Sequence, residues 1–367
     1  MAVAATTSGR WALTPVVAPV IGLVVLVAVW GRTLPVVAAV VAALALAGAV
    51  LAAVHHAEVI AHKVGEPFGS LTLAIAVTVI EVGLIVTLMS SGGGKTSGLA
   101  RDTVFAAVMI TCNGILGLSL LTASRRHGVA LFNAEGSGAA LATVATLTTL
   151  TLVLPTFTTS VPGPEFNGVQ LAFAAIASAA IYGVFVVTQT VRHRDFFLPV
   201  AIEDEDDADE HAEPPSGRAA LSSLGLLLIS LVVVVGLAKV ESPFIEDAVA
   251  SAGLPQAVVG VVIALLVLLP ESLAAYRAAR RNRTQVSVNL ALGSAMASIG
   301  LTIPAIAIAS LWLDGPLLLG LGPTQLVLFA LTMVVGALTV VPGRATRLQG
   351  SVHLAILAAF LVLAASP

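Results

Sequence analysis

The sequence predicts an all-α integral membrane protein with eleven transmembrane helices. Three observations lead to this fold class. Of the 367 residues, 58% are hydrophobic and 10% are charged, whereas soluble domains carry about 25% charged residues. Charged, Pro and Gly clusters divide the chain into eleven apolar runs, each near the roughly 20 residues that a spanning helix needs. Lys and Arg are also concentrated in alternate loops between these runs. Together the three observations exclude an ordinary water-soluble fold.

The predicted spans follow one another along the whole chain. They cover residues 12–30, 35–56, 68–90, 102–122, 138–158, 168–190, 220–238, 252–276, 286–312, 323–341 and 349–366. The first run is long for a signal peptide and has no clear small-residue cleavage site before the next run, so we interpret it as a retained helix.

The positions of Lys and Arg predict which loops face the cytoplasm, where basic residues are retained. With the N-terminus inside, four basic residues fall outside: Arg32, Lys95, Arg101 and Lys239. Thirteen fall inside: Arg10, Lys63, Arg125, Arg126, Arg192, Arg194, Arg218, Arg277, Arg280, Arg281, Arg283, Arg344 and Arg347. This asymmetry predicts a multi-pass protein of the cell inner membrane with a cytoplasmic N-terminus and an external C-terminus.

One strongly polar stretch, from Asp195 to Gly217, separates the sixth and seventh spans and holds eight acidic residues between positions 203 and 213. We therefore divide the chain into an N-terminal helix (1–33), a first five-helix repeat (34–194), an acidic cytoplasmic linker (195–218) and a second five-helix repeat (219–367). Runs of like charge usually stay solvated. The alternative, a segment that concentrates cations at the inner mouth, remains open.

Two acidic residues, Glu81 and Glu271, lie well within the predicted spans. At an offset of 190, residues 70–81 align with residues 260–271, and both segments end in glutamate. The charge count makes these spans run in opposite directions, so the two copies are inverted, as in many secondary transporters. Because an ionised carboxylate in hydrocarbon is costly, such groups pair, bind cations or take up protons. We predict that Glu81 and Glu271 together form a cation and proton site.

Neutral side chains near the two acids are candidate oxygen ligands. Hard cations such as Ca²⁺ take about six to eight oxygens. The candidates are Thr78, Thr111, Asn113, Asn289, Ser294 and Ser298. The alternative is that these small polar residues only serve helix packing.

A third polar cluster begins at the end of the second span. His55, Glu58, His62 and Glu66 share one face if the helix continues beyond residue 56, and His56 and Lys63 lie among them. The cluster could ligate a metal or relay protons at the inner mouth, or it could be a hydrated helix end. It also supports a rival from another class, an intramembrane metal-dependent hydrolase whose ligands include His55, Glu58 and His62.

Several motifs carry a family resemblance. They are Gly65-Glu-Pro-Phe-Gly-Ser through Glu81, Phe132-Asn-Ala-Glu-Gly136, Pro270-Glu271, Ala291-Leu-Gly-Ser294 and Ile299-Gly-Leu-Thr-Ile-Pro304. Together they resemble the bacterial calcium/proton antiporters of the calcium/cation antiporter superfamily, a branch that also includes sodium-potassium/proton exchangers. The resemblance covers about residues 35–366. It implies eleven helices, an acidic linker between two five-helix halves, and one essential acid per repeat, Glu81 and Glu271.

The chain departs from the plant and yeast branch, in which Gly-Asn-Ala precedes each acid. Here the preceding residues are Val77-Thr-Val-Ile80 and Val267-Leu-Leu-Pro270, and Ala297 stands where Gln is expected. These departures weaken the assignment of Ca²⁺ in particular. The Gly-Thr-Ser-x-Pro-Glu pattern of sodium/calcium exchangers is also missing, which indicates protons as the counter-ion.

We therefore expect an antiporter, not an enzyme, that exchanges Ca²⁺ for protons by alternating access and needs no cofactor. Na⁺/H⁺ or K⁺/H⁺ exchange at the same site is the first alternative. A passive channel is disfavoured because no carbonyl filter motif occurs, and no basic patch supports nucleic-acid binding. The expected partners are the transported cation, protons and the lipid bilayer, and a homo-oligomer remains open.

Overall fold

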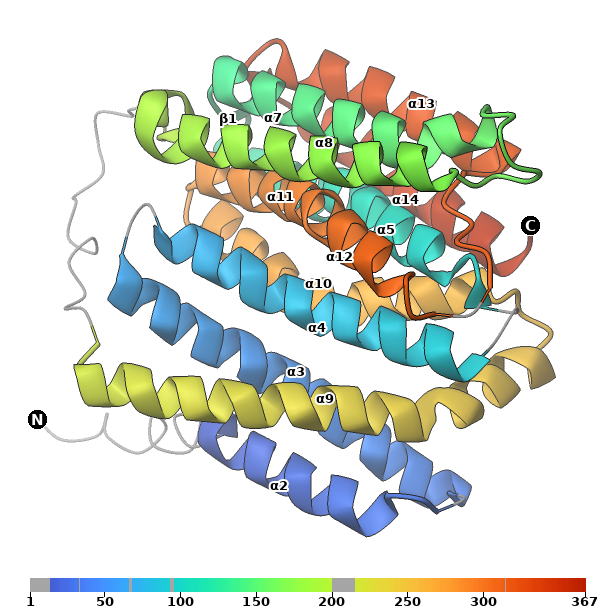
Figure 1. The fold of residues 1–367 in the computed structure, drawn as a ribbon. Coiled ribbons are helices and arrows are strands. Elements are labelled where there is room, and N and C mark those ends of the chain that lie inside the picture. Colours follow the sequence, from blue (N-terminus) through green and yellow to red (C-terminus); the bar gives the residue numbers. More distant parts are fainter. Residues whose placement is uncertain (1–13, 33, 66–67, 93–95, 200–214, 314) are drawn as a thin grey trace, which may run out of the picture. The chain divides into compact units, whose positions relative to one another are not determined.

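The computed structural model describes residues 14–32, 34–65, 68–92, 96–199, 215–313 and 315–367, and these are almost entirely helical (Figure 1). Within these ranges ten helical spans are long and apolar enough to cross a bilayer, and α2 (Thr14–Val29) is a shorter apolar helix. Each of the eleven predicted runs overlaps one of these spans or α2. The predicted all-α membrane fold is confirmed.

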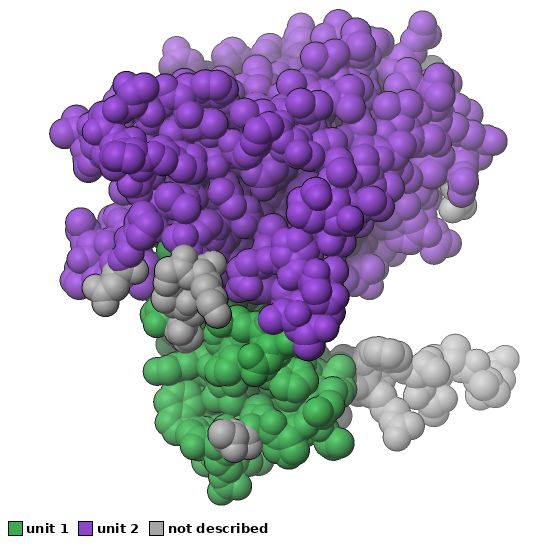
Figure 2. Space-filling model, turned by 90° about the vertical axis from the view of Figure 1, so that its right-hand side faces the viewer, with its two compact units in different colours: residues 1–92, 207–248 green, residues 93–206, 249–367 purple. Residues whose placement is uncertain are grey.

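The contacts divide the chain into two compact units, which Figure 2 shows in different colours. Unit 1 comprises residues 1–92 and 207–248, and unit 2 comprises residues 93–206 and 249–367. Each unit therefore takes helices from both halves of the sequence. The two predicted repeats concern the relation between sequence segments rather than their packing, and they stay a prediction.

Unit 1 contains α2, α3 (Val36–Val64), α4 (Phe68–Gly92) and α9 (Gly217–Ser251) as far as residue 248. Helix α3 packs against both α2 and α4. Glycines let α9 and α2 approach each other closely. A Cβ on Gly22 of α2 would lie 2.7 Å from Cγ1 of Val233, and a Cβ on Gly236 of α9 would lie 2.7 Å from Cδ2 of Leu26. Small residues at such crossings are typical of membrane helices.

Two boundaries in unit 1 differ from the prediction. Helix α3 continues to Val64 rather than residue 56, and α9 continues to Ser251 rather than residue 238. In both cases a polar stretch ends the apolar run but not the helix, because polar side chains at a membrane surface are hydrated while the backbone hydrogen bonds continue. Helix α3 stops at Gly65, whose φ of 74° is left-handed and suits glycine.

The first part of unit 2 contains helices that change type within a span. α5 (Leu99–Met109), the π-helical η2 (Ile110–Ile115) and α6 (Leu116–His127) form one span. Two further spans end in non-α turns; they consist of α7 (Ala134–Thr148), η3 (Thr149–Val153) and η4 (Leu154–Thr156), and of α8 (Gly168–Val187) and η5 (Thr188–Arg192), after which η6 (Arg194–Phe197) follows. π-Helical turns are rare and occur often at functional sites.

The second part of unit 2 contains α10 (Ala257–Arg280), α11 (Thr284–Gly300), α12 (Thr302–Ala309), α13 (Pro323–Val340) and α14 (Arg347–Ala365). Helix α5 packs against α10, and α6 packs against α14. A short antiparallel pair, β1 (Ala130–Leu131) with β2 (Arg344–Ala345), joins the loop after α6 to the loop before α14. Helix α14 approaches α6 closely at Gly350, where a Cβ would lie 2.6 Å from the backbone nitrogen of Leu121.

Large apolar side chains remain exposed along the outer faces of the helices. Val37 is 77% exposed, Val169 81% and Leu338 70%. Such a surface suits acyl chains rather than water. Many polar side chains, in contrast, are buried inside the protein.

Candidate functional site

The two predicted acids lie near the middle of their helices. Glu81 is on α4 in unit 1 and is only 2% exposed. Glu271 is on α10 in unit 2, where it is half-buried and its Oε2 is shielded from solvent. Each acid thus lies inside a membrane span, as predicted. Their convergence on one pocket stays a prediction.

A proline directly precedes Glu271 inside α10. Pro270 has no N–H, so the carbonyl of Leu266 has no helical donor at that position. Open backbone carbonyls in membrane helices occur where protein or a cavity surrounds them.

Two predicted ligands, Thr78 and Thr111, direct their hydroxyl hydrogens to their own helices. Thr78 Oγ1 donates to the carbonyl of Ala74 at 2.8 Å, and Thr111 Oγ1 donates to that of Ala107 at 2.7 Å. Each oxygen keeps lone pairs that can accept or coordinate. Thr78 precedes Glu81 by three residues on α4 and therefore shares its face.

Both predicted asparagines form hydrogen bonds through the nitrogen and the oxygen of their side-chain amides, with partners in unit 2. Asn113 Nδ2 donates to Thr332 Oγ1 at 3.0 Å, and Asn113 Oδ1 lies 3.1 Å from Nδ1 of His353. Asn289 Nδ2 donates to the carbonyl of Phe197 at 2.7 Å, and Asn289 Oδ1 accepts from Gln285 at 2.8 Å. The contacts to Thr332, His353 and Phe197 join separate helices, so the structure gives the amides a packing role. A ligand role stays a prediction.

The two predicted serines lie four residues apart on α11. Ser294 is half-buried and Ser298 is 5% exposed. Residues at this spacing share a helix face. They are on the helix that follows the Glu271 helix, as the sequence predicts.

The predicted inner-mouth cluster lies on the last turns of α3. His55, Glu58 and His62 are exposed and share a face, because the helix continues to Val64. Glu66 lies outside the described residues. Within the described part of the chain, no group of three or more His, Cys, Asp or Glu side chains could hold a metal ion.

His56 points the other way and is 3% exposed. Its Nε2 lies 3.1 Å from the carbonyl of Pro15, and its Nδ1 lies 3.3 Å from Oγ of Ser223. The carbonyl of Pro15 needs this donor because Pro19, four residues on in α2, has no N–H. His56 thus donates from Nε2, accepts from Ser223 at Nδ1, and joins α2, α3 and α9.

Buried titratable residues outside the predicted set include His353 and Glu241. His353 is fully buried on α14, and Glu241 is 1% exposed on α9. His353 lies close to the predicted start of the last span, and Glu241 lies beyond the predicted end of the seventh. Extending the buried periodicity of α9 past Lys239 would have identified Glu241.

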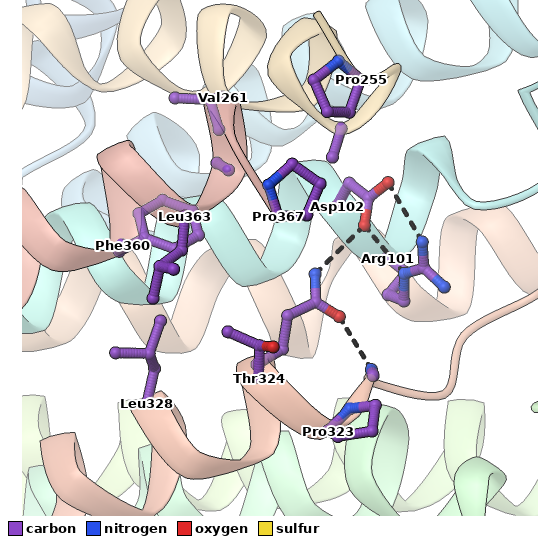
Figure 3. A pocket seen from close by; sticks show the side chains of 14 residues that line it. Arg101, Asp102, Pro255, Val261, Pro323, Thr324, Leu328, Phe360, Leu363 and Pro367 are labelled. Atoms are coloured by element: carbon purple, nitrogen blue, oxygen red, sulfur yellow. Dashed lines mark hydrogen bonds and ion pairs between the residues drawn. The ribbon is translucent and has the colours of Figure 1, made fainter.

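Unit 2 also has a cavity of about 250 Å³, which Figure 3 shows from close by. Arg101 pairs with Asp102 at 2.8 Å, and Gln325 donates to Asp102 at 3.3 Å. Val261, Phe360 and other apolar residues form most of its wall. Val261 precedes Glu271 by ten residues on α10, about 15 Å along the axis, so this cavity is not at the acid.

The chain is similar to known ion transporters. The sequence profile of the sodium/calcium exchanger protein family matches residues 34–191 and 222–365. The putative ionic transporter y4hA of Sinorhizobium fredii is 48% identical over 88% of this chain and 87% of its own length. The sodium-potassium/proton antiporter ChaA of Escherichia coli is 35% identical over 95% of both chains.

Solved structures share the fold at low sequence identity. The H⁺/Ca²⁺ exchanger CAX has a TM-score of 0.71 at 15% identity and covers 97% of this chain and 89% of its own. Native YfkE has a TM-score of 0.69 at 14% identity, with 95% of this chain and 98% of its own covered. At these identities the likeness concerns the fold.

Proposed function

We propose that this chain, which belongs to the sodium/calcium exchanger protein family, couples cation movement to proton movement through Glu81 and Glu271. The family resemblance predicted from the motifs is confirmed. The chain is a multi-pass membrane antiporter rather than an enzyme. Its placement in the inner membrane, with a cytoplasmic N-terminus, follows from the charge distribution and is part of the proposal.

The observation that carries the proposal is the matching pair of acids. Glu81 and Glu271 end aligned segments of the two predicted inverted copies, and each lies within a span. Inverted repeats place substrate sites near the midplane in many secondary transporters. Intramembrane acids are rare and mark ion or proton pathways.

The chemistry of coupling follows from competition for the same oxygens. In a low-dielectric site a carboxylate is stabilised either by a bound cation or by a proton. A cation that arrives displaces protons, and protons that arrive displace the cation. Rocking of one helix group against the rest would then expose the loaded site to one face at a time.

Two observations favour different cations. ChaA is described as a sodium-potassium/proton antiporter and aligns over nearly the whole chain, which favours Na⁺ and K⁺. Two carboxylates match the charge of one Ca²⁺ or of two protons, which favours calcium. We place Na⁺ or K⁺ first, because the identity to ChaA is more than twice that to the H⁺/Ca²⁺ exchanger CAX, and Ca²⁺ second.

A reconstituted flux assay tests the proposal. Purified protein in liposomes that contain a pH-sensitive dye is exposed to an imposed proton gradient, and NaCl, KCl or CaCl₂ is added in turn. The wild-type protein should dissipate the gradient with at least one of these salts. Glu81→Gln and Glu271→Gln should each abolish the exchange, because a neutral amide cannot alternate between a proton and a cation.

Glu135→Gln is the matched control, since this glutamate is exposed in the first turn of α7. It should retain the wild-type rate. Full exchange in either buried variant would refute the assignment of that acid. A wild-type protein that moves none of the three cations would refute the proposed function itself.

A further inference from the structure

Glu241 is a buried acid that the proposed exchange site does not use. It lies on α9 in unit 1 and is 1% exposed, and its Oε1 is shielded from solvent without a hydrogen-bond partner among the described residues. The buried stripe of α9 consists of Ser223, Leu227, Ser230, Val234, Leu237 and Glu241, at alternating steps of four and three. Glu241 thus extends the inward face of the helix and does not point to the lipid.

The charged and polar side chains next to Glu241 on α9 are directed elsewhere. The Lys239 ammonium lies over the ring of Trp30, 5.9 Å from its centroid. The Ser242 hydroxyl donates to Glu246 at 3.1 Å. A buried carboxylate with no cationic partner is costly, so Glu241 must hold either a proton or a cation.

Glu241 lies at a different depth from Glu81. Helices α4 and α9 run in the same direction (Figure 1), and they touch where a Cβ on Gly83 would lie 2.9 Å from Val235. Glu81 lies two residues before Gly83, and Glu241 lies six residues after Val235. At 1.5 Å per residue, Glu241 is therefore about 12 Å farther along the helix axis, toward the end that the basic residues predict to be external.

We propose that Glu241 is a separate binding site for the exchanged cation or a proton, on the external side of Glu81. This inference rests on the proposed function for the identity of the ions. The site acts as an entry station: it receives the ion before Glu81 does and lowers the concentration needed for half-maximal exchange from that side.

The flux assay is repeated with Glu241→Gln, Glu241→Asp and the control Glu246→Gln, whose carboxylate is half-buried on the same helix and already accepts from Ser242. Glu241→Gln should retain exchange, since Glu81 and Glu271 remain. Its half-saturating concentration of NaCl, KCl or CaCl₂ on the external side should rise by about tenfold, the effect of losing one charged contact. Glu241→Asp should lie between, and Glu246→Gln should match the wild type.

Infrared difference spectroscopy provides a readout that does not require transport. Raising the pH or adding CaCl₂ to the purified protein should remove the C=O stretch of a buried protonated carboxyl. Glu241→Gln should lack one component of this change, while Glu246→Gln keeps it. This result would stand even if the flux assay showed that the proposed function is wrong.

Thermal unfolding of each variant shows whether it is folded, and Glu241→Asp replaces Glu241→Gln in both assays if the latter is not. The proposal is overturned if the folded variant matches Glu246→Gln in half-saturation and in the infrared spectrum. It is also overturned if a folded Glu241→Gln loses all exchange, because Glu241 would then belong to the same step as Glu81.

Discussion

Replacing His353 by leucine tests the buried polar network of unit 2. His353 Nδ1 lies 3.1 Å from Asn113 Oδ1, and its Nε2 lies 3.1 Å from Thr339 Oγ1. The Asn113 amide nitrogen is directed to Thr332, so Oδ1 faces the imidazole and Nδ1 must carry a hydrogen. Leucine removes both interactions and leaves Asn113 Oδ1 buried without its donor.

The magnitude follows from these contacts. Interhelical hydrogen bonds in membranes contribute about 0.6 kcal/mol each, so two bonds contribute about 1.2 kcal/mol. An orphaned buried acceptor costs about 1–3 kcal/mol. Thr339 loses little, because its hydroxyl hydrogen can turn from Nε2 to the carbonyl of Val335, which lies 2.8 Å away. We expect the free energy of unfolding to fall by about 2–4 kcal/mol in total.

The double variant His353→Leu with Asn113→Leu sharpens the test. With both polar partners gone, no amide is orphaned, and Thr332 still donates to Leu328 at 2.8 Å. The double variant should therefore lose less stability than the sum of the two single variants, by about 1 kcal/mol or more.

Unfolding by a denaturing detergent in mixed micelles measures these free energies. Ser351→Leu, an exposed change on the same helix, is the control and should shift stability by no more than about 0.5 kcal/mol. Unchanged stability in His353→Leu, or strictly additive losses in the double variant, would refute the network as a stabilising element.

Two further substitutions test the packing of each unit. Gly350→Val should lower the free energy of unfolding by about 1–3 kcal/mol or prevent folding, because its Cβ would lie 2.6 Å from the backbone nitrogen of Leu121. The control is Gly138→Val, whose Cβ meets nothing within 4 Å. Equal stability of the two variants in the same detergent titration would contradict the reasoning. His56→Leu should cost about 1–3 kcal/mol, since the carbonyl of Pro15 loses its donor; the exposed neighbour His55→Leu should be nearly neutral, and a similar loss in both would show that the donor to Pro15 is not what matters.

The amino-acid sequence was sufficient for the membrane class, the number and order of the spans and the two acids within them. The physical reason is that hydrocarbon acts on each segment separately: an apolar run of sufficient length must form a helix, and an acid inside it must pair, bind a cation or take up a proton. Glu81 and Glu271 were recognisable because the energetic cost of an intramembrane carboxyl does not depend on which helix lies beside it.

The packing of the helices determined where α9 ends and which buried polar groups are partners, and a hydropathy profile does not reveal either. Helix α9 continues past Lys239 because backbone hydrogen bonds persist where the apolar run ends, and this places Glu241 inside the protein. Asn113 and His353 are 240 residues apart, yet they share a hydrogen bond. Which polar groups satisfy one another depends on how helices pack, so these partners emerge only in the folded molecule.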